Sequence, residues 1–152
     1  MRRKEKEITD KTAIESIILR SSVCRLALSE DNHPYIVPLC FGYKDNTLYF
    51  HSALEGKKLD IMKNNNNVCF EFDIDHHIVE AEDACGWGMN YRSVIGFGKV
   101  SIIDDPEFKI KAINAIIERY AGKPLKYTKA KLKDTVIIKV EIEGITGKTS
   151  GY

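Results

Sequence analysis

The sequence lacks the features that mark membrane and exported proteins. No apolar run approaches the roughly 18 residues that a membrane-spanning helix needs. The basic start, Arg2-Arg3-Lys4, is not followed by the apolar segment of a signal peptide. We therefore expect a cytoplasmic protein that does not associate with membranes.

Cysteine is also scarce, and its spacing is unlike that of a zinc site or a disulfide framework. None of the four cysteines belongs to a C-x-x-C pair, and three lie in apolar, strand-like runs. In such runs cysteine behaves as a small hydrophobic side chain. We expect reduced thiols at all four positions, which are Cys24, Cys40, Cys69 and Cys85.

An excess of charge of one sign is absent, and so are the common glycine-rich nucleotide motifs. Lys and Arg number 23, and Asp and Glu number 22. This balance argues against a nucleic-acid-binding protein that relies on a broad basic field. Neither G-x-x-x-x-G-K-[ST] nor G-x-G-x-x-G is present, so we expect no P-loop and no Rossmann site. A length of 152 residues with 43% hydrophobic content fits one domain, residues 1–152.

What the sequence does contain is a pattern of short strands with three helices. Asp10, Ser52 and Asp105 stand where the predicted helices begin. The first three strands, joined by tight turns, are predicted to form a meander that curls into a barrel. The predicted fold is α+β, a six- to seven-stranded antiparallel split β-barrel with flanking helices. Helices are expected over residues 11–21, 52–63 and 106–121, and strands over 23–29, 35–43, 47–51, 68–75, 90–103 and 136–142.

Proline and glycine add local detail to this pattern. Pro38 cannot donate a ladder hydrogen bond, so it predicts a sheet edge or a bulge. Gly96 and Gly98 interrupt the longest strand, which indicates a bulge, a bend or the close approach of another backbone. Gly122 and Pro124 are expected to end the last helix. The apolar stripe of that helix is predicted to be Ile110, Ile113, Ile117 and Tyr120. The tail from residue 147 is expected to be loose unless a partner orders it.

The segment from Leu48 to Asp60 joins a strand end to the start of a predicted helix. Ser52 and Glu55 have the spacing of a capping box, which marks a helix N-terminus. A helix N-terminus leaves backbone N–H groups unpaired and carries partial positive charge. Such a terminus suits an anion.

Two lysines and a glycine follow this predicted cap. Gly56 leaves the backbone open to close approach. Lys57 and Lys58 lie about one turn further on, and helical side chains lean back toward the N-terminus. One interpretation is a phosphate site with His51 at its rim. The alternative, an ordinary helix start with two solvated lysines, remains open.

An acidic, histidine-containing stretch provides possible metal ligands, but without the recurrent spacing of known sites. His76 and His77, as neighbours on a strand, would point to opposite faces. We interpret this stretch as a solvated strand or loop and predict no metal site. The residues considered are Asp73, Asp75, His76, His77, Glu80, Glu82, Asp83 and Cys85.

Five segments in order carry a resemblance to a known family. Residues 23–28, 34–39 and 49–58 are similar to the FMN-binding split-barrel flavoproteins related to pyridoxamine 5′-phosphate oxidase. Residues 90–98 and 141–148 resemble the nitroimidazole-resistance branch of that superfamily. The likeness runs from about residue 17 to residue 151. The C-terminal part lacks the Arg- and His-bearing substrate segment of pyridoxamine 5′-phosphate oxidase. Oxidation of pyridoxamine 5′-phosphate, a form of the vitamin, is therefore not supported.

The resemblance implies a homodimer with FMN at the subunit interface. The FMN phosphate would be held just after the third strand, by Ser52, Lys57 and Lys58, and the flavin ring would run along residues 37–39. Cofactor contacts are implied for Val37, Pro38, Leu39, His51, Ser52, Ala53, Lys57 and Lys58 of one subunit. The other subunit would contribute Trp87, Tyr91, Arg92 and Ser93.

The implied activity is transfer of electrons or hydride from reduced FMN to a small acceptor, such as a nitro compound. The flavin supplies the chemistry and the protein orients it. His51 is the catalytic candidate, as a proton donor or as a hydrogen-bond partner of the cofactor.

Less specific roles remain open for three of these residues. His51 could be a strand-end histidine with a backbone partner, Trp87 could serve packing alone, and Arg92 could pair with Glu71 or Asp73. For the whole protein, the alternatives are a non-catalytic flavin carrier and a haem-binding barrel. In the barrel an axial ligand would be His51, His76 or His77.

Overall fold

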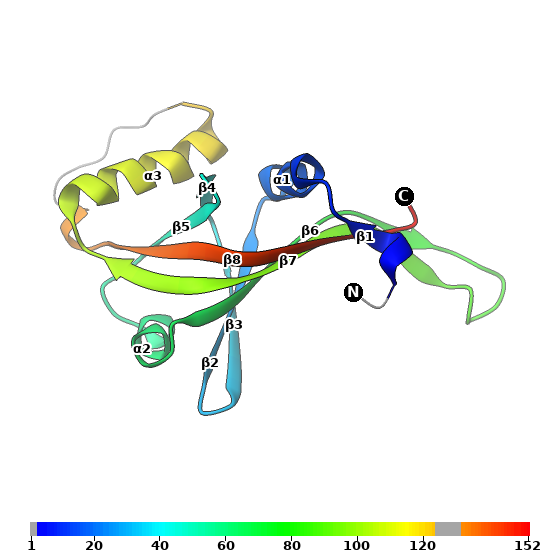
Figure 1. Ribbon diagram of the computed structural model, residues 1–152, viewed down its shortest axis with the longest axis horizontal. Coiled ribbons are helices and arrows are strands. Elements are labelled where there is room, and N and C mark those ends of the chain that lie inside the picture. The colour runs from blue at the N-terminus through cyan, green and yellow to red at the C-terminus, as the bar shows by residue number, and fades with distance from the viewer. Residues whose placement is uncertain (1–2, 124–131) are drawn as a thin grey trace.

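Eight antiparallel strands form one curled sheet in the computed structural model, which describes residues 3–123 and 132–152. The strand order is β3-β2-β6-β7-β8-β5-β4, with β1 paired to β8 (Figure 1). The α+β split-barrel fold is thereby confirmed. The strands are β1 (Glu7–Ile8), β2 (Cys24–Glu30), β3 (His33–Leu39), β4 (Gly42–Lys44), β5 (Thr47–Ser52), β6 (Asn67–Val79), β7 (Gly88–Ile103) and β8 (Val136–Ser150). The helices are η1 (Lys4–Lys6), α1 (Lys11–Arg20), α2 (Lys57–Asn64) and α3 (Pro106–Ala121).

The strand expected over residues 35–43 is two strands at opposite ends of the sheet order. Leu39 of β3 pairs with Cys24 of β2, whereas Gly42 of β4 pairs with Tyr49 of β5. The three-strand meander is therefore wrong, because the chain changes edges between Leu39 and Gly42. Pro38 lies on the edge strand β3, as its missing N–H predicts.

The hydrophobic core lies inside the curl of the sheet. Alternation along β6 buries Val68, Phe70, Phe72 and Ile74, as predicted. From α1, Ile14, Ile17 and Ile18 complete the same cluster. Asp10 caps this helix because its carboxylate accepts hydrogen bonds from the N–H groups of Thr12 and Ala13, at 3.3 and 3.1 Å.

The glycines of β7 act through close approach and a bulge. Gly96 lies opposite Phe70 of β6, and a Cβ at Gly96 would stand 2.1 Å from the Phe70 ring. No real side chain can be accommodated at that separation unless the ring moves. The β7–β8 register also shifts between Phe97 and Gly98, so the strand bends there.

The buried face of α3 differs from the predicted stripe. Lys109, Ala112 and Ile116 are buried, whereas Ile110, Ile113 and Ile117 are half-buried and Tyr120 is 45% exposed. Lys109 tolerates burial because its ammonium contacts the Asp104 carboxylate and donates to the Leu132 carbonyl oxygen at 3.0 Å. Gly122 ends the helix as expected, and Pro124 lies outside the described residues.

The tail that was expected to be loose is part of the sheet. Strand β8 continues to Ser150 and pairs with β7, and residues 147 and 148 also pair with β1. Beyond it, the Tyr152 hydroxyl donates to the carbonyl oxygen of Asp75, 2.7 Å away. The expectation failed because these partners lie far away in the sequence.

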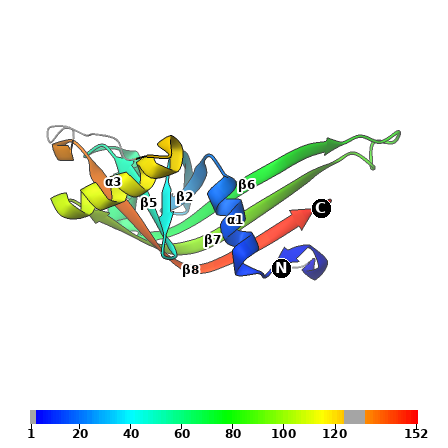
Figure 2. The ribbon, with the colours of Figure 1, turned by 90° about the horizontal axis from the view of Figure 1, so that it is seen from above.

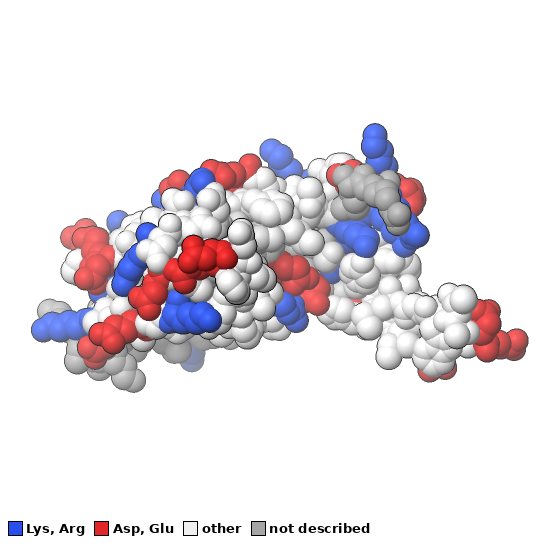
Figure 3. All heavy atoms as spheres, turned by 90° about the horizontal axis from the view of Figure 1, so that it is seen from below, with Lys and Arg blue, Asp and Glu red and all other residues white. Residues whose placement is uncertain are grey.

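Strands β6 and β7 extend past the rest of the sheet as a two-stranded arm, residues 76–90 (Figure 2). At its root Asp75 has a φ of 58°, and the register shifts between Ile74 and His77. The Asp75 carboxylate bonds Arg20 and Arg92, and these bonds hold its pKa below the usual value. Apart from its acidic tip the arm carries little charge (Figure 3).

We predict that Gly96→Ala lowers the free energy of unfolding by about 1–3 kcal/mol, because the added methyl group collides with Phe70. Urea denaturation monitored by circular dichroism measures the change. Gly144→Ala is the matched control, since a Cβ at Gly144 meets no atom within 4 Å. Equal stability of the two variants would contradict the packing explanation.

Candidate functional site

The junction between β5 and α2 holds the residues predicted to bind phosphate, but the helix begins later than expected. Ser52 is the last residue of β5 and pairs with Val136 of β8, so it cannot cap a helix. The capping-box prediction is wrong because this ladder pairing keeps Ser52 extended. The N-cap is Gly56, with φ 136° and ψ 156°, a conformation that side chains rarely adopt.

The first turn of α2 has no side-chain cap. The Gly56 carbonyl oxygen accepts from the N–H groups of Leu59 and Asp60, at 2.8 and 3.2 Å. The N–H groups of Lys57 and Lys58 have no partner within the helix, as helix geometry dictates. Lys57 and Lys58 therefore lie in the first turn of α2, closer to its N-terminus than the sequence predicted.

The hydroxyl of Ser52 is the unsatisfied group at this junction. Ser52 is 4% exposed, and its Oγ has no hydrogen-bond partner in the described part of the chain. A buried polar group left unpaired costs about 1–3 kcal/mol. Such a group fits a site that an external acceptor or donor completes. Together with two lysines and free N–H groups, it suits the phosphate of a bound cofactor.

Tyr35 is a neighbour of this junction that sequence reasoning missed. The Lys57 ammonium lies 4.8 Å from the centre of the Tyr35 ring. Strand alternation could have indicated it, because Tyr35, Val37 and Leu39 share one half-buried face of β3. Pro38 lies on the other, exposed face of this strand. Tyr35 and Lys57 line a groove of about 330 Å³. Its other lining residues are Glu30, Asp31, His33, Pro34 and Ile61.

His51 and Ser52 point to opposite faces of the sheet. Ser52 faces the core, whereas His51 lies on the outer face, defined here as the face that carries Ile95 and Phe97 of β7. His51 is exposed, and its ring makes no hydrogen bond within residues 3–123 and 132–152. Among the described residues, no backbone group therefore bonds the His51 ring, and Ala53 beside it is also exposed.

The predicted residues from the second subunit lie in or near the arm. In Figure 1, α2 and the arm stand at opposite sides of the molecule. Trp87 is 54% exposed, Tyr91 is half-buried and Ser93 is buried. Within one chain, the predicted site residues therefore form two separate groups, one near the β5–α2 junction and one in or near the arm.

Arg92 has partners other than those considered from the sequence. Its guanidinium bonds the Asp75 carboxylate and lies 4.3 Å from the centre of the Tyr152 ring. The carboxylates of Glu71 and Asp73 bond Arg25 instead. Pairing of Arg92 with Glu71 or Asp73 is therefore wrong.

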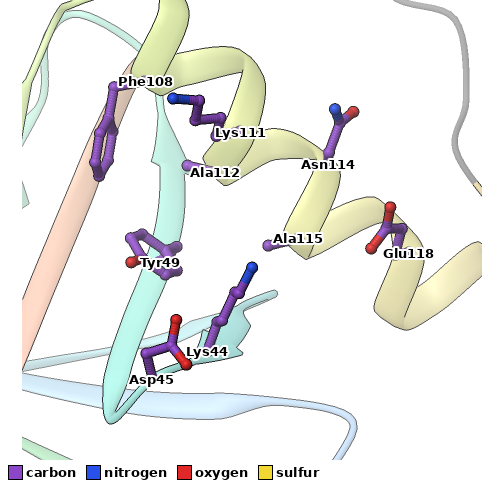
Figure 4. A pocket seen from close by; sticks show the side chains of 9 residues that line it. All are labelled: Lys44, Asp45, Tyr49, Phe108, Lys111, Ala112, Asn114, Ala115 and Glu118. Atoms are coloured by element: carbon purple, nitrogen blue, oxygen red, sulfur yellow. The ribbon is translucent and has the colours of Figure 1, made fainter.

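A second groove, of about 410 Å³, lies between α3 and the β4–β5 hairpin (Figure 4). The groove exists because Ala112 and Ala115 present small side chains to it. The ring centres of Tyr49 and Phe108, which also line it, are 6.0 Å apart. None of the predicted site residues lines it. The lining residues are Lys44, Asp45, Tyr49, Phe108, Lys111, Ala112, Asn114, Ala115 and Glu118.

The cysteines and the acidic, histidine-containing stretch are the residues considered for thiol or metal chemistry. Burial raises the pKa of the Cys24 and Cys69 thiols, which therefore stay protonated near neutral pH. All four cysteines are free thiols. In residues 3–123 and 132–152, no group of three His, Cys, Asp or Glu side chains is placed to hold a metal. His76 bonds Asp73 at 2.9 Å.

No helix within the described ranges has the length and apolar character to cross a bilayer.

Several solved structures have the same fold as this chain. A Bacteroides thetaiotaomicron protein, provisionally assigned to 5-nitroimidazole antibiotic resistance, is 36% identical with a TM-score of 0.85. The match covers 94% of this chain and 86% of that one. The flavocytochrome Anf3 of Azotobacter vinelandii is 15% identical with a TM-score of 0.86, over 100% of this chain and 72% of that one. An FAD- and haem-binding protein of Mycobacterium smegmatis is 20% identical with a TM-score of 0.85, over 97% and 74%.

Sequence comparisons give a relative and a family. An uncharacterised Rhizobium meliloti protein is 33% identical over 57 residues, which span 38% of this chain and 37% of that protein. The family model described as pyridoxamine 5′-phosphate oxidase matches residues 10–149, nearly the whole chain. On this match, the chain belongs to the pyridoxamine 5′-phosphate oxidase family.

Proposed function

We propose that the protein binds FMN and acts in the cytoplasm as an oxidoreductase that reduces a small acceptor such as a nitro compound. The observation that carries the proposal is the β5–α2 junction, where the buried Ser52 hydroxyl lacks a partner beside an uncapped helix start with two lysines. The relative provisionally assigned to nitroimidazole resistance supports the choice of acceptor.

Different residues at and near the β5–α2 junction would bind different parts of the cofactor. Lys57 and Lys58 neutralise the phosphate, and the free N–H groups of the first turn of α2 donate to its oxygens. Residues 37–39 of β3 border the flavin ring. His51, exposed on the outer face, is available to donate a proton to the acceptor. When bound, the flavin supplies the electron-transfer chemistry.

We propose further that two copies of the chain form a homodimer around the cofactor. Ile95 and Phe97 are 43% and 58% exposed at the centre of the outer face, an arrangement typical of a buried interface. A second copy on this face would bring Trp87, Tyr91, Arg92 and Ser93 toward the junction of its partner. This arrangement accounts for the separation of the two groups of site residues within one chain.

A non-catalytic flavin or haem protein is the second candidate. The fold is shared with a flavocytochrome and with an FAD- and haem-binding protein. His51 and His77 are exposed, so either ring is accessible to a haem iron.

The absorption spectrum of the purified protein separates these candidates. We expect flavin bands near neutral pH that bleach on anaerobic reduction and return when a 5-nitroimidazole is added. A Soret band in place of flavin bands would support the haem protein. Flavin that is reduced but not reoxidised by any nitro compound would contradict the proposed acceptor.

We predict that Lys57→Ala combined with Lys58→Ala weakens FMN binding roughly tenfold to a hundredfold, because two charged phosphate contacts are lost. Quenching of flavin fluorescence measures the dissociation constants. Riboflavin, which lacks the phosphate, should bind both forms alike. Lys63→Ala is the control, because Lys63 is an exposed lysine of the same helix that pairs with Asp60. FMN affinity that survives the double change would refute the phosphate site.

We predict that Phe97→Asp converts the dimer into monomers, because a carboxylate would be buried without a partner at the interface. Sedimentation equilibrium measures the mass of the protein in solution. Leu19→Asp provides the control, since Leu19 is 56% exposed on α1 and away from the outer face. A wild-type protein that is monomeric at all concentrations would contradict the dimer.

A further inference from the structure

The hydroxyl of Tyr91 on β7 contacts the ammonium of Lys148 on β8. Lys148 lies opposite Ser93, and Tyr91 lies opposite Ser150, so the two residues are diagonal neighbours on the outer face. The Lys148 Nζ also stands 4.9 Å from the centre of the Tyr91 ring. One charged hydrogen bond therefore holds the hydroxyl, and through it the ring.

The chemistry of this pair fixes the direction of the hydroxyl proton. Lysine has three donors and no acceptor, so Tyr91 must accept in the bond from Lys148. The phenolic proton is then left for another partner, and no acceptor for it lies in the described part of the chain. A half-buried hydroxyl in this state is a donor held ready for an external oxygen.

Three other tyrosines donate their phenolic protons to partners within the chain. Tyr43 donates to the Glu15 carboxylate at 3.1 Å. Tyr120 donates to the Ser22 carbonyl oxygen at 3.0 Å, and Tyr152 donates to the Asp75 carbonyl oxygen. Tyr91 differs from these three because its hydroxyl has only a donor, Lys148, as hydrogen-bond partner among the described residues.

The lysine is placed for this contact although a carboxylate lies nearby in the sheet. Glu7 of β1 is the residue opposite Lys148, yet no ion pair joins their side chains within residues 3–123 and 132–152. Lys148 is half-buried between β1 and β7, which restricts its side chain. The Lys148 ammonium therefore donates its hydrogen bond to the Tyr91 hydroxyl and does not pair with Glu7 in the described structure.

We propose that Lys148 is a positioning residue that fixes Tyr91 as a hydrogen-bond donor to an sp² oxygen in the flavin site. The inference rests on the proposed function. Two sources can supply such an oxygen: a carbonyl of the flavin ring, or a nitro oxygen of the acceptor. Both accept one hydrogen bond from a neutral phenol, so the same pair of residues serves either.

The test compares Tyr91→Phe, Lys148→Met and the double variant with wild type, each as the full chain. If the oxygen belongs to the ring, FMN and riboflavin both bind about three- to tenfold more weakly to each single variant. The double variant should bind no more weakly than either single one, because Lys148 acts through Tyr91. Fluorescence quenching gives these constants without turnover.

If the oxygen belongs to the acceptor, flavin affinity stays unchanged. The rate of flavin reoxidation by a 5-nitroimidazole then falls by a similar factor, with the same lack of additivity. Lys148→Arg keeps a donor and should restore wild-type values. Lys139→Met is the matched control, because Lys139 is a lysine of the same strand that contacts Glu141 instead.

Additive losses in the double variant, or wild-type values in both assays, would overturn the role of Lys148. Tyr91→Phe keeps the ring, so it decides the outcome even where Lys148→Met does not fold. A wild-type protein that binds no flavin would overturn the proposed function, and this inference with it. Flavin binding and flavin reoxidation that are both insensitive to all three variants overturn this inference alone.

Discussion

The packing of Phe70 against the bare backbone of Gly96 is the contact on which the sheet depends. The Phe70 ring meets Phe72 at a centroid distance of 5.8 Å, and Phe72 meets Phe41 at 4.8 Å. Phe41 lies where the chain passes from one edge strand to the other. One line of aromatic contacts thus joins β7 at the centre of the sheet to the crossover that determines its curl.

Local signals in the sequence predicted much of this fold, and long-range pairing explains where they failed. Alternation identified the core face of β6, and Asp10 marked the start of α1. Ser52 had the spacing of a cap, but its ladder pairing with Val136 took precedence. Residues 147–150 contain a single strand former, Thr149, and they are extended because β1 and β7 pair with them.

The candidate site was predicted as a set of residues but not as an arrangement. The family resemblance indicated both groups, and only the topology shows that α2 and the arm lie apart. The opposite directions of His51 and Ser52 follow from the two-residue period of a strand and were available from the sequence. The Lys148–Tyr91 contact was not, since it depends on the β7–β8 register.

The position of β8 in the strand order has a consequence for how the chain folds. β8 lies between β7 and β5, and it also pairs with β1, which is about 140 residues earlier. Contacts of such wide separation slow folding, because distant segments must meet before either is stabilised. During synthesis on the ribosome, β5 and β7 remain open edges until this last strand emerges. The nascent chain is therefore expected to require protection from aggregation until translation is nearly complete.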